Sequence, residues 1–183
     1  MTINAILKPL RIVRYRLSHQ GVRATALWAA DHLVRGILGA NIRRVSQITP
    51  HLHVGGQYRR RGWPRMVKRG ISAVIDMRIE FDDREHGIAP PRYLYLPTVD
   101  DDAPTLAQLR EGVAFMEDEV ARGGSVYIHC GAGVGRAATM AAAYLIHTGM
   151  TPEGAWARIQ GVRPFIRPTA VQLAQIERFA AGR

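Results

Sequence analysis

The segment from Val126 to Arg136 constrains the fold of this 183-residue chain more than any other. It opens with a short apolar run, Val126–Ile128, passes through a loop that contains three glycines, and continues into a charge-free apolar stretch after Arg136. The short run fits a buried strand and the following stretch fits a buried helix. A strand that leads through a glycine-rich turn directly into a helix indicates an α/β layer fold.

Strands and helices alternate along the chain from about residue 48. The expected strands are 52–54, 72–77, 93–96 and 126–128, and the expected helices are 64–69, 105–122, 136–147, one that starts at Thr151 and one that starts at Thr169. Thr105 and Gln108 have the spacing of a capping box, and Thr151 with Pro152 fits an N-cap and a first-turn proline. We therefore expect residues 48–183 to form a central, mostly parallel sheet flanked by helices.

Basic residues are concentrated in the N-terminal part of the chain. Residues 1–69 hold fourteen Lys and Arg against one acid, Asp31, whereas residues 70–183 hold eleven against fourteen acids, so the formal charges are +13 and −3. This asymmetry suggests an anionic partner, namely membrane lipid, nucleic acid or a phosphorylated substrate; a solvated basic surface is the alternative.

Residues 1–47 are expected to form a basic helical extension with two helical stretches. Apolar residues recur at helical spacing at Ile3, Ile6, Leu7, Leu10, Val13 and Leu17, and again at Leu27, Trp28, Val34, Ile37 and Leu38. The favoured interpretation is that these helices pack on the domain or pair two subunits. A basic amphipathic helix can instead lie on an anionic bilayer.

The chain has one cysteine, Cys130, so no intramolecular disulfide is possible and the fold needs no oxidising compartment. No apolar stretch reaches the roughly 20 residues of a membrane span. The N-terminus lacks the pattern of a secretory signal, but it is Arg-rich and acid-poor, as in mitochondrial transit peptides. We therefore expect a cytoplasmic protein, peripherally attached if the extension binds membrane, or a mitochondrial protein if the extension is a transit peptide.

The loop between Cys130 and Arg136 has the composition of an anion-binding site. Gly131, Gly133 and Gly135 allow backbone amides to turn inward, and the following helix adds unpaired donors and a positive dipole end. Such donors favour the thiolate form of a cysteine, and a guanidinium can donate paired hydrogen bonds to phosphate. No Gly-Lys-Ser/Thr follows, which excludes a Walker loop. We predict an oxyanion site; a buried structural cysteine is the alternative.

The run His129-Cys130-Gly131-Ala132-Gly133-Val134-Gly135-Arg136 resembles the His-Cys-x5-Arg signature of the protein tyrosine and dual-specificity phosphatase superfamily. The resemblance spans about residues 48–181 and is closest, over 98–146, to mitochondrial phosphatidylglycerophosphate phosphatases and related bacterial dual-specificity phosphatases. It implies a dual-specificity-phosphatase-like fold and a cysteine-dependent phosphatase that needs no metal or cofactor. The substrate-binding residues that it implies are His129, Gly131, Ala132, Gly133, Val134, Gly135 and Arg136. Rhodaneses and arsenate reductases also use cysteine loops, but the five-residue spacing and an upstream aspartate argue against both.

The resemblance also implies a two-step reaction. Cys130 attacks phosphorus and becomes phosphocysteine, Arg136 and the loop amides stabilise the equatorial oxygens, and an acid protonates the leaving oxygen and then activates water. The family's acid loop falls at residues 97–104, where an aspartate ahead of Ala-Pro selects Asp100, with Asp102 and then Asp101 as alternatives. A solvated acidic turn is the simpler interpretation. His129 is expected to orient the loop or only to pack at the strand end.

One residue departs from the family pattern. Ala137 stands where the family usually has a Ser or Thr whose hydroxyl stabilises the departing thiolate, and Thr139 faces another way on the helix. Release of phosphate from Cys130 is therefore expected to be slow. A phosphate-binding protein with little turnover is the corresponding alternative.

The substrate is less well defined by the sequence. Gly131 and Val134 stand where related lipid phosphatases often have Lys or Arg, so Arg78, Arg163 and Arg167 are candidates to supply that charge. Residues 80–83 fall at the position of an acidic loop in the phosphatidylglycerophosphate phosphatases. We expect a phospholipid, inositide or other small phosphate monoester, with a phosphotyrosine or phosphoserine/threonine protein as the alternative.

Other partners are predicted from the charge pattern. Basic residues within 1–69 are expected to favour an anionic membrane surface, at about 1 kcal/mol for each residue close to the lipid. The run 59–61 and its basic neighbours are the main candidates. Nucleic acid is not an expected partner, because the sequence contains no recognised nucleic-acid module.

Overall fold

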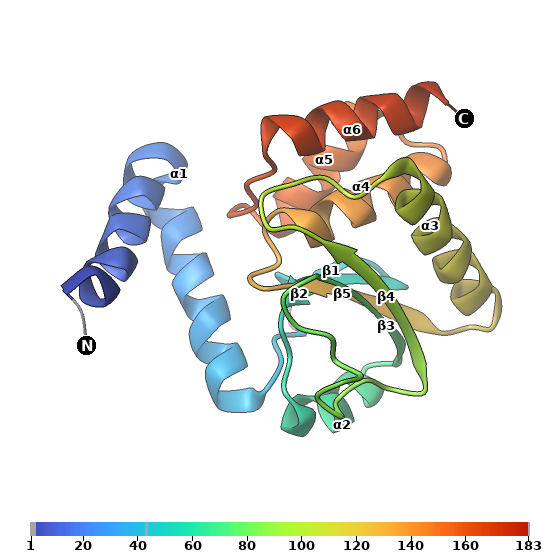
Figure 1. Ribbon diagram of the computed structural model, residues 1–183, viewed down its shortest axis with the longest axis horizontal. Helices are drawn as coiled ribbons and strands as arrows, with labels where there is room; N and C mark the ends of the chain where they lie inside the picture. The colour runs from blue at the N-terminus through green and yellow to red at the C-terminus, as the bar shows by residue number, and fades with distance from the viewer. Residues whose placement is uncertain (1–2, 43, 183) are drawn as a thin grey trace.

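The computed structural model describes the backbone of residues 3–42 and 44–182, and the side chains of residues 12–42 and 44–182. Figure 1 shows a twisted sheet with helices on both faces. The elements are α1 (Ile3–Leu38), β1 (Gln47–Thr49), β2 (Leu52–Gly56), η1 (Arg60–Gly62), α2 (Trp63–Val67), β3 (Ile71–Arg78), β4 (Arg92–Thr98), α3 (Leu106–Ala121), β5 (Ser125–Cys130), α4 (Arg136–His147), α5 (Pro152–Val162) and α6 (Ala170–Ala181).

The five strands lie in the order β1-β2-β5-β3-β4. β1 pairs antiparallel with β2, and the other three pairings are parallel. Gly56 pairs with Cys130, and Asp76 pairs with His129, so the carboxyl ends of β2, β3 and β5 meet at one edge. The predicted α/β fold with a mostly parallel sheet is confirmed. β1 was not expected, because three residues are too few to show a period.

α4 is the central helix of the larger core. All its residues from Arg136 to Ile146 are buried, and α3, α5 and α6 pack around it on one face of the sheet (Figure 1). Five alanines in α4 allow this close packing, and its bounds agree with the predicted 136–147. Thr105 and Thr169 form capping boxes at the starts of α3 and α6, and Thr151 caps α5, as their spacing predicts.

α1 consists of two helical halves that meet at a kink at Gly21, whose φ of 80° and ψ of 172° are not helical. The second half packs on the domain through Ala24, Asp31 and Arg35, all buried. The predicted apolar face is therefore wrong in part, because Ile37 is 63% exposed whereas two charged residues are buried. The side chains of Ile3, Ile6, Leu7 and Leu10 lie outside the described residues.

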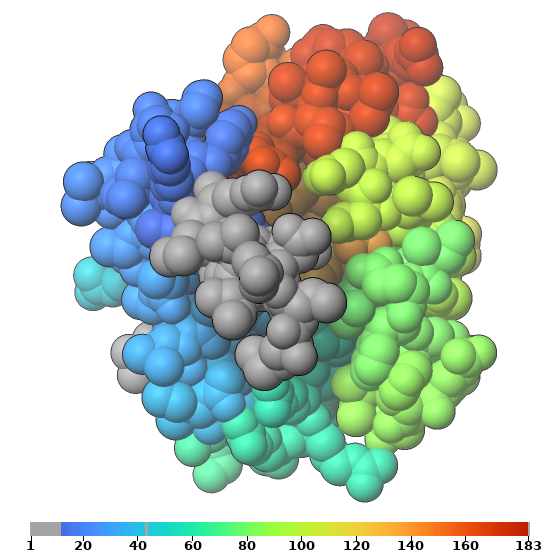
Figure 2. All heavy atoms as spheres, turned by 60° about the vertical axis from the view of Figure 1, so that its left-hand side comes forward, coloured from blue at the N-terminus to red at the C-terminus, as the bar shows by residue number. Residues whose placement is uncertain are grey.

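The first half of α1 lies beside the C-terminal part of the chain (Figure 2). Arg16 Nη1 donates to Phe165 O at 3.1 Å, and Gln20 Nε2 donates to Ile166 O at 2.9 Å. Within the described residues, no helix combines the length and the apolar character that a membrane crossing requires.

Candidate active site

The loop between β5 and α4 directs its carbonyl oxygens toward the surrounding protein. Gly131 O accepts from Gln57 N at 3.1 Å and from Arg35 Nη1 at 3.4 Å. Ala132 O and Gly133 O both accept from the Arg163 guanidinium, at 3.5 and 3.2 Å. The last two carbonyls accept from backbone amides: Val134 O from Arg167 N at 2.7 Å, and Gly135 O from Thr139 N at 2.9 Å. Because N–H and C=O point to opposite sides of a peptide unit, the loop amides face the concave side.

The loop amides themselves have few partners. Gly133 N donates to Cys130 Sγ at 3.3 Å, and no other amide of residues 131–135 has an acceptor among the described residues. Gly133 has a φ of +68°, and a Cβ there would lie 2.3 Å from the Gly55 carbonyl carbon. Only glycine therefore fits where the loop passes the end of β2.

Cys130 ends β5 at the floor of this concavity and is 3% exposed. Arg136 is buried, and its Nη1 donates to Thr98 O at 2.8 Å. Its guanidinium also pairs with both carboxylate oxygens of Glu80, at 2.8 and 2.9 Å, and with Asp100 Oδ1 at 2.8 Å. Arg136 Nε is buried without a hydrogen-bond partner among the described residues. One donor of the guanidinium is therefore left for an anion beside Cys130.

The electrostatics of this group are those of a tight ion pair. The hydrogen bond from Arg136 is the main reason why the pKa of Glu80 is lowered to about 2. Burial acts to lower the pKa of Arg136, but the hydrogen bond with Glu80 and the nearby negative charges outweigh it and raise that pKa. The sequence indicated an acidic segment at 80–83 but not that Glu80 would orient the guanidinium.

The acidic segment after β4 is fixed to the start of α6. Thr169 Oγ1 donates to Asp101 O at 3.0 Å, and Gln172 Nε2 donates to Asp102 O at 2.8 Å. Asp101 has a φ of 62°, so the chain turns sharply there. The carboxylate of Asp100 lies against Arg136, whereas Asp102 accepts from Ala103 N and does not line the cavity. Of the three predicted acids, the structure brings Asp100 next to Arg136, and its catalytic role stays a prediction.

A cavity of about 530 Å³ opens over Cys130. This volume is in the range of about 300–1,000 Å³ that is usual for small-molecule sites. The lining residues from the domain are Glu80, Asp100, Asp101, Cys130, Gly131, Ala132, Val134, Gly135, Arg136, Arg167 and Gln172. α1 contributes Ile12, Tyr15, Arg16, Trp28 and His32. Nothing in the sequence indicated this second set, because no local pattern relates α1 to a loop 100 residues away.

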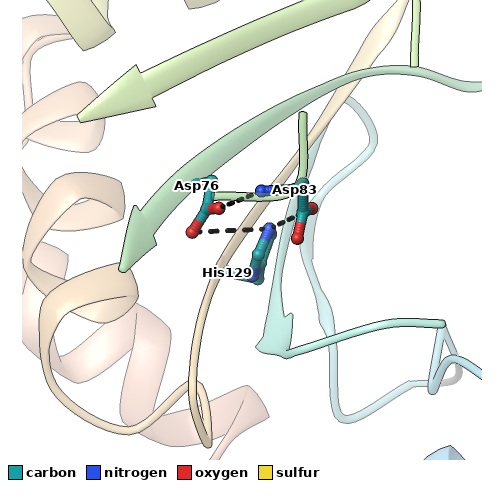
Figure 3. A group of neighbouring side chains, drawn as sticks. All are labelled: Asp76, Asp83 and His129. Carbon is teal, nitrogen blue, oxygen red and sulfur yellow. Dashed lines mark hydrogen bonds and ion pairs between the residues drawn. The ribbon is translucent and has the colours of Figure 1, made fainter. Parts of the chain in front are cut away.

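His129 does not line the cavity. Its ring is fully buried, with Nε2 at 3.0 Å from Asp83 Oδ2 and 3.8 Å from Asp76 Oδ1 (Figure 3). The cluster connects the ends of β3 and β5 to the segment that carries Glu80. The ring therefore supports the site from behind, where the expected role of His129 in orienting the loop is possible, and substrate binding by His129 stays a prediction.

The Asp76, Asp83 and His129 side chains lie close enough together for a metal ion, within 4.8 Å. All four carboxylate oxygens of Asp76 and Asp83 already accept hydrogen bonds. Those of Asp76, for example, accept from Arg78 N and from the Tyr93 hydroxyl. Burial raises the pKa of Asp76. Burial also acts to raise the pKa of Asp83, but hydrogen bonds, first that from His129, outweigh it and lower the pKa. The carboxylate oxygens of this cluster therefore all have donors, whereas His129 Nδ1 is buried without a hydrogen-bond partner among the described residues.

The three arginines proposed to supply charge have different positions. Arg167 lines the cavity. Arg78 does not; it donates to Gln57 Oε1 and Glu80 Oε1, at 2.8 and 3.0 Å. Arg163 is fully buried behind the loop and donates to loop carbonyls, so its prediction as a substrate contact is wrong.

α4, the helix that follows the loop, has Ala137 at the position where the family usually has a Ser or Thr. Ala137 is fully buried and has no hydroxyl to offer. The hydroxyl of Thr139 donates to Gly135 O at 3.2 Å, so it is bonded to the helix backbone.

The sequence matches known phosphatases. Residues 57–150 match the family model described as "Polymorphic toxin system, DSP-PTPase phosphatase". The phosphatidylglycerophosphate phosphatase PTPMT2 of Arabidopsis thaliana is 31% identical over 162 residues, which cover 81% of this chain and 68% of the plant protein. The protein phosphatase Slingshot homolog 3 of Mus musculus is 30% identical over 147 residues, 78% of this chain but only 22% of the mouse protein.

Solved structures show the same similarity. A crystal structure of PTPMT1 in complex with PI(5)P superposes with a TM-score of 0.69 at 33% identity, covering 74% of this chain and 94% of that one. Human DUSP28, at 22% identity and a TM-score of 0.68, covers 75% of this chain and 96% of its own and shares the fold. The residues matched by the family model begin after α1 ends.

Proposed function

Since this chain belongs to the DSP-PTPase phosphatase family and is a cysteine-dependent phosphatase, we propose that Cys130, Arg136 and Asp100 carry out its reaction, on a phospholipid or inositide phosphate monoester. The observation that carries the proposal is the outward bonding of all five loop carbonyls, which turns the loop amides toward Cys130. Of the amides of residues 131–135, only that of Gly133 has an acceptor among the described residues, and this acceptor is Cys130 Sγ.

In the first step the Cys130 thiolate attacks phosphorus. An S–P bond forms while the bond between phosphorus and the leaving oxygen breaks, and Asp100 gives its proton to that oxygen. The loop amides and Arg136 Nε donate to the equatorial oxygens. Glu80 holds the guanidinium in place through its paired hydrogen bonds.

In the second step water attacks phosphorus and gives a proton to the Asp100 carboxylate. The S–P bond breaks, the thiolate re-forms and inorganic phosphate leaves. Asp100 suits both steps, because its carboxylate is 77% exposed and lines the cavity, within reach of alcohol and water. Residue Ala137 provides no hydroxyl for the departing sulfur, so this step is expected to limit turnover.

Two observations support a lipid or inositide substrate. The relative of known structure was crystallised with PI(5)P, and the plant relative is named for phosphatidylglycerophosphate. The cavity also extends well beyond the loop, from Cys130 to α1, so an alcohol larger than the phosphate itself can be accommodated.

An anionic membrane surface is the partner that we propose through the basic part of the chain. The side chains of Arg59, Arg60, Arg61, Arg65, Lys68 and Arg69 are exposed around η1 and α2. Val67, 50% exposed, lies among them. Basic residues near a lipid surface attract anionic headgroups.

The test of the reaction is phosphate release from three substrates: a generic aryl phosphate, phosphatidylinositol 5-phosphate in vesicles and a phosphotyrosine peptide. The wild type is expected to hydrolyse all three, with the largest kcat/KM on the lipid. Cys130→Ser and Arg136→Lys are expected to lose at least about 1,000-fold, and Asp100→Asn about 100-fold.

Asp102→Asn is the matched control for the acid. An Asp102 variant that is as impaired as Asp100→Asn would contradict the assignment of the acid. A larger kcat/KM on the phosphopeptide than on the lipid would favour a protein substrate. Phosphate binding without turnover would indicate a binding protein instead.

A further inference from the structure

We propose that Arg16 and Arg167 form a second anion site in the same cavity, which binds a phosphodiester group on the alcohol part of the substrate. This inference rests on the proposed function and specifies its substrate class: a phosphate monoester whose alcohol also carries a phosphodiester. The argument depends on α1, which precedes the residues matched by the family model.

The two anion sites share one cavity. Its lining runs from Cys130 and Arg136 at the loop to Arg16, Tyr15 and Trp28 on α1. A monoester bound at the loop therefore has its alcohol directed along this space, because the leaving oxygen lies opposite the attacking sulfur in an in-line displacement.

Arg16 is buried without an opposite charge. It is 6% exposed, and its Nη1 donates to Gln20 Oε1 at 2.6 Å and to Phe165 O at 3.1 Å. No carboxylate pairs with it among the described residues, and its Nε has no partner there. Buried charges are normally paired, so an unpaired guanidinium in a cavity wall indicates that an anion is missing.

Arg167 lines the same cavity as Arg16, and its guanidinium lies over the ring of Tyr15, the residue before Arg16. The pKa of Arg16 is lowered, first by burial and then by the charge of Arg167. Arg167 has only a distant partner, Asp101 at 3.9 Å, and both side chains are about half exposed or more. An anion between the two guanidinium groups would remove this repulsion and pair both charges.

Aromatic rings hold both guanidinium groups. Arg16 Cζ lies 4.7 Å from the centre of the Trp28 ring, and Arg167 Cζ lies 5.4 Å from the centre of the Tyr15 ring. Such contacts fix the planes of the groups and still leave their edges free for hydrogen bonds. The donors are therefore positioned before a ligand binds.

The rest of the cavity has the opposite charge. Glu80 and Asp100 surround Arg136 at the loop end, so a second anion is repelled there and attracted toward α1. A phosphodiester carries one negative charge that is shared between two non-bridging oxygens. These oxygens point in different directions, which suits two guanidinium groups that come from different elements. An acidic phosphopeptide would bring carboxylates past Asp100 and Asp101, and is disfavoured.

The experiment compares two soluble substrates. Glycerol phosphate carries only a monoester, whereas the deacylated headgroup of phosphatidylglycerophosphate carries a monoester and a diester. For Arg16→Gln, the ratio of kcat/KM for the diester-bearing substrate to that for glycerol phosphate is expected to fall about 10- to 100-fold, which is the usual effect of hydrogen bonds to charged groups. Arg167→Gln is expected to lower the ratio in the same direction and, being half exposed, is a second variant if Arg16→Gln does not fold.

A control variant separates recognition by Arg16 from a general effect of charge on α1. Arg14→Gln removes an exposed charge from the same helix and should keep the wild-type ratio. A ratio in Arg16→Gln within twofold of the wild type overturns the proposal. A loss of kcat/KM that is seen only with the acylated lipid in vesicles also overturns it, because that would indicate membrane contact. A loss of kcat/KM that is seen only with the phosphopeptide overturns it as well.

Failure of the proposed function gives a different result. If the wild type hydrolyses no substrate, including an aryl phosphate, calorimetry on Cys130→Ser with glycerophosphoglycerol, which has only the diester, still tests the site. Weaker binding in Cys130→Ser/Arg16→Gln than in Cys130→Ser supports the second anion site. Equal binding overturns it.

Discussion

Ala137 is the single residue with the clearest expected effect on turnover. The variant Ala137→Ser places a hydroxyl at the first turn of α4, beside the buried end of the loop. A hydrogen bond to the departing thiolate is worth up to a few kcal/mol, so kcat should rise about 10-fold. In stopped-flow measurements with an aryl phosphate, the wild type should show a burst of product that the variant lacks.

The matched control is Ala138→Ser, at the next position of the same buried helix. This variant also adds a hydroxyl to α4, but on a different side of the helix, because successive helical residues lie about 100° apart. A wild type without a burst, or an equal rise of kcat in both variants, would contradict a slow second step.

Gly133 is the loop position at which a side chain is least tolerated. An added methyl group would lie 2.3 Å from backbone atoms of Gly55 and would require a φ of +68°. We expect Gly133→Ala to lower the free energy of unfolding by about 2 to 4 kcal/mol in urea titrations. Gly131→Ala is the control, because the atom nearest to the added methyl group would be 3.9 Å away. An equal loss of stability in both variants would show that the loop as a whole is sensitive to substitution, and not only the contact of Gly133 with Gly55.

At the scale of elements, β2 contains a buried histidine that makes stability depend on pH. His53 is 2% exposed, its Nδ1 has no partner among the described residues, and burial is the main reason why its pKa is lowered to about 4. Because the unfolded chain binds the proton more tightly, the contribution of His53 is complete above pH 6.5 and is lost as the pH falls toward 4.

The prediction concerns the slope of the free energy of unfolding against pH. Between pH 7 and pH 4.5, the wild type should lose about 2 to 3 kcal/mol more stability than His53→Leu, which cannot titrate. Urea titrations at several pH values measure this difference. Parallel curves for the two proteins would show that the fold tolerates the charged imidazole.

The elements that could be predicted from the sequence are those with local signals. The capping boxes at Thr105 and Thr169, the apolar run of β5 and the alanine-rich α4 each carry their own pattern, and all four are present. The loop chemistry was equally local, since Cys130 and the glycines are contiguous. Two features could not be predicted because they depend on tertiary contacts. These are the pairing of Arg136 with Glu80 and the contribution of α1 side chains to the lining of the cavity.

At the scale of the whole molecule, α1 is joined to the loop by buried charges. Asp31 accepts from Arg35 Nε at 3.0 Å and from Asn41 Nδ2 at 2.9 Å, and its Oδ1 lies 3.7 Å from Arg163 Nη1. The same two arginines donate to the carbonyls of residues 131–133. The one acid among the first 69 residues is therefore the link between the extension and the site.

The last prediction concerns this link. Asp31→Asn leaves two buried guanidinium groups without their carboxylate, and removal of one partner of a buried pair costs about 3 to 5 kcal/mol. Because these guanidinium groups also orient the loop, inorganic phosphate should raise the melting temperature of the variant less than that of the wild type. Asp118→Asn on α3 breaks two partly exposed ion pairs, with Arg92 and with Arg122. It should change neither the stability nor the gain from phosphate measurably. If Asp31→Asn loses stability but gains as much from phosphate as the wild type, α1 is a structural support only, and the coupling between the extension and the loop is refuted.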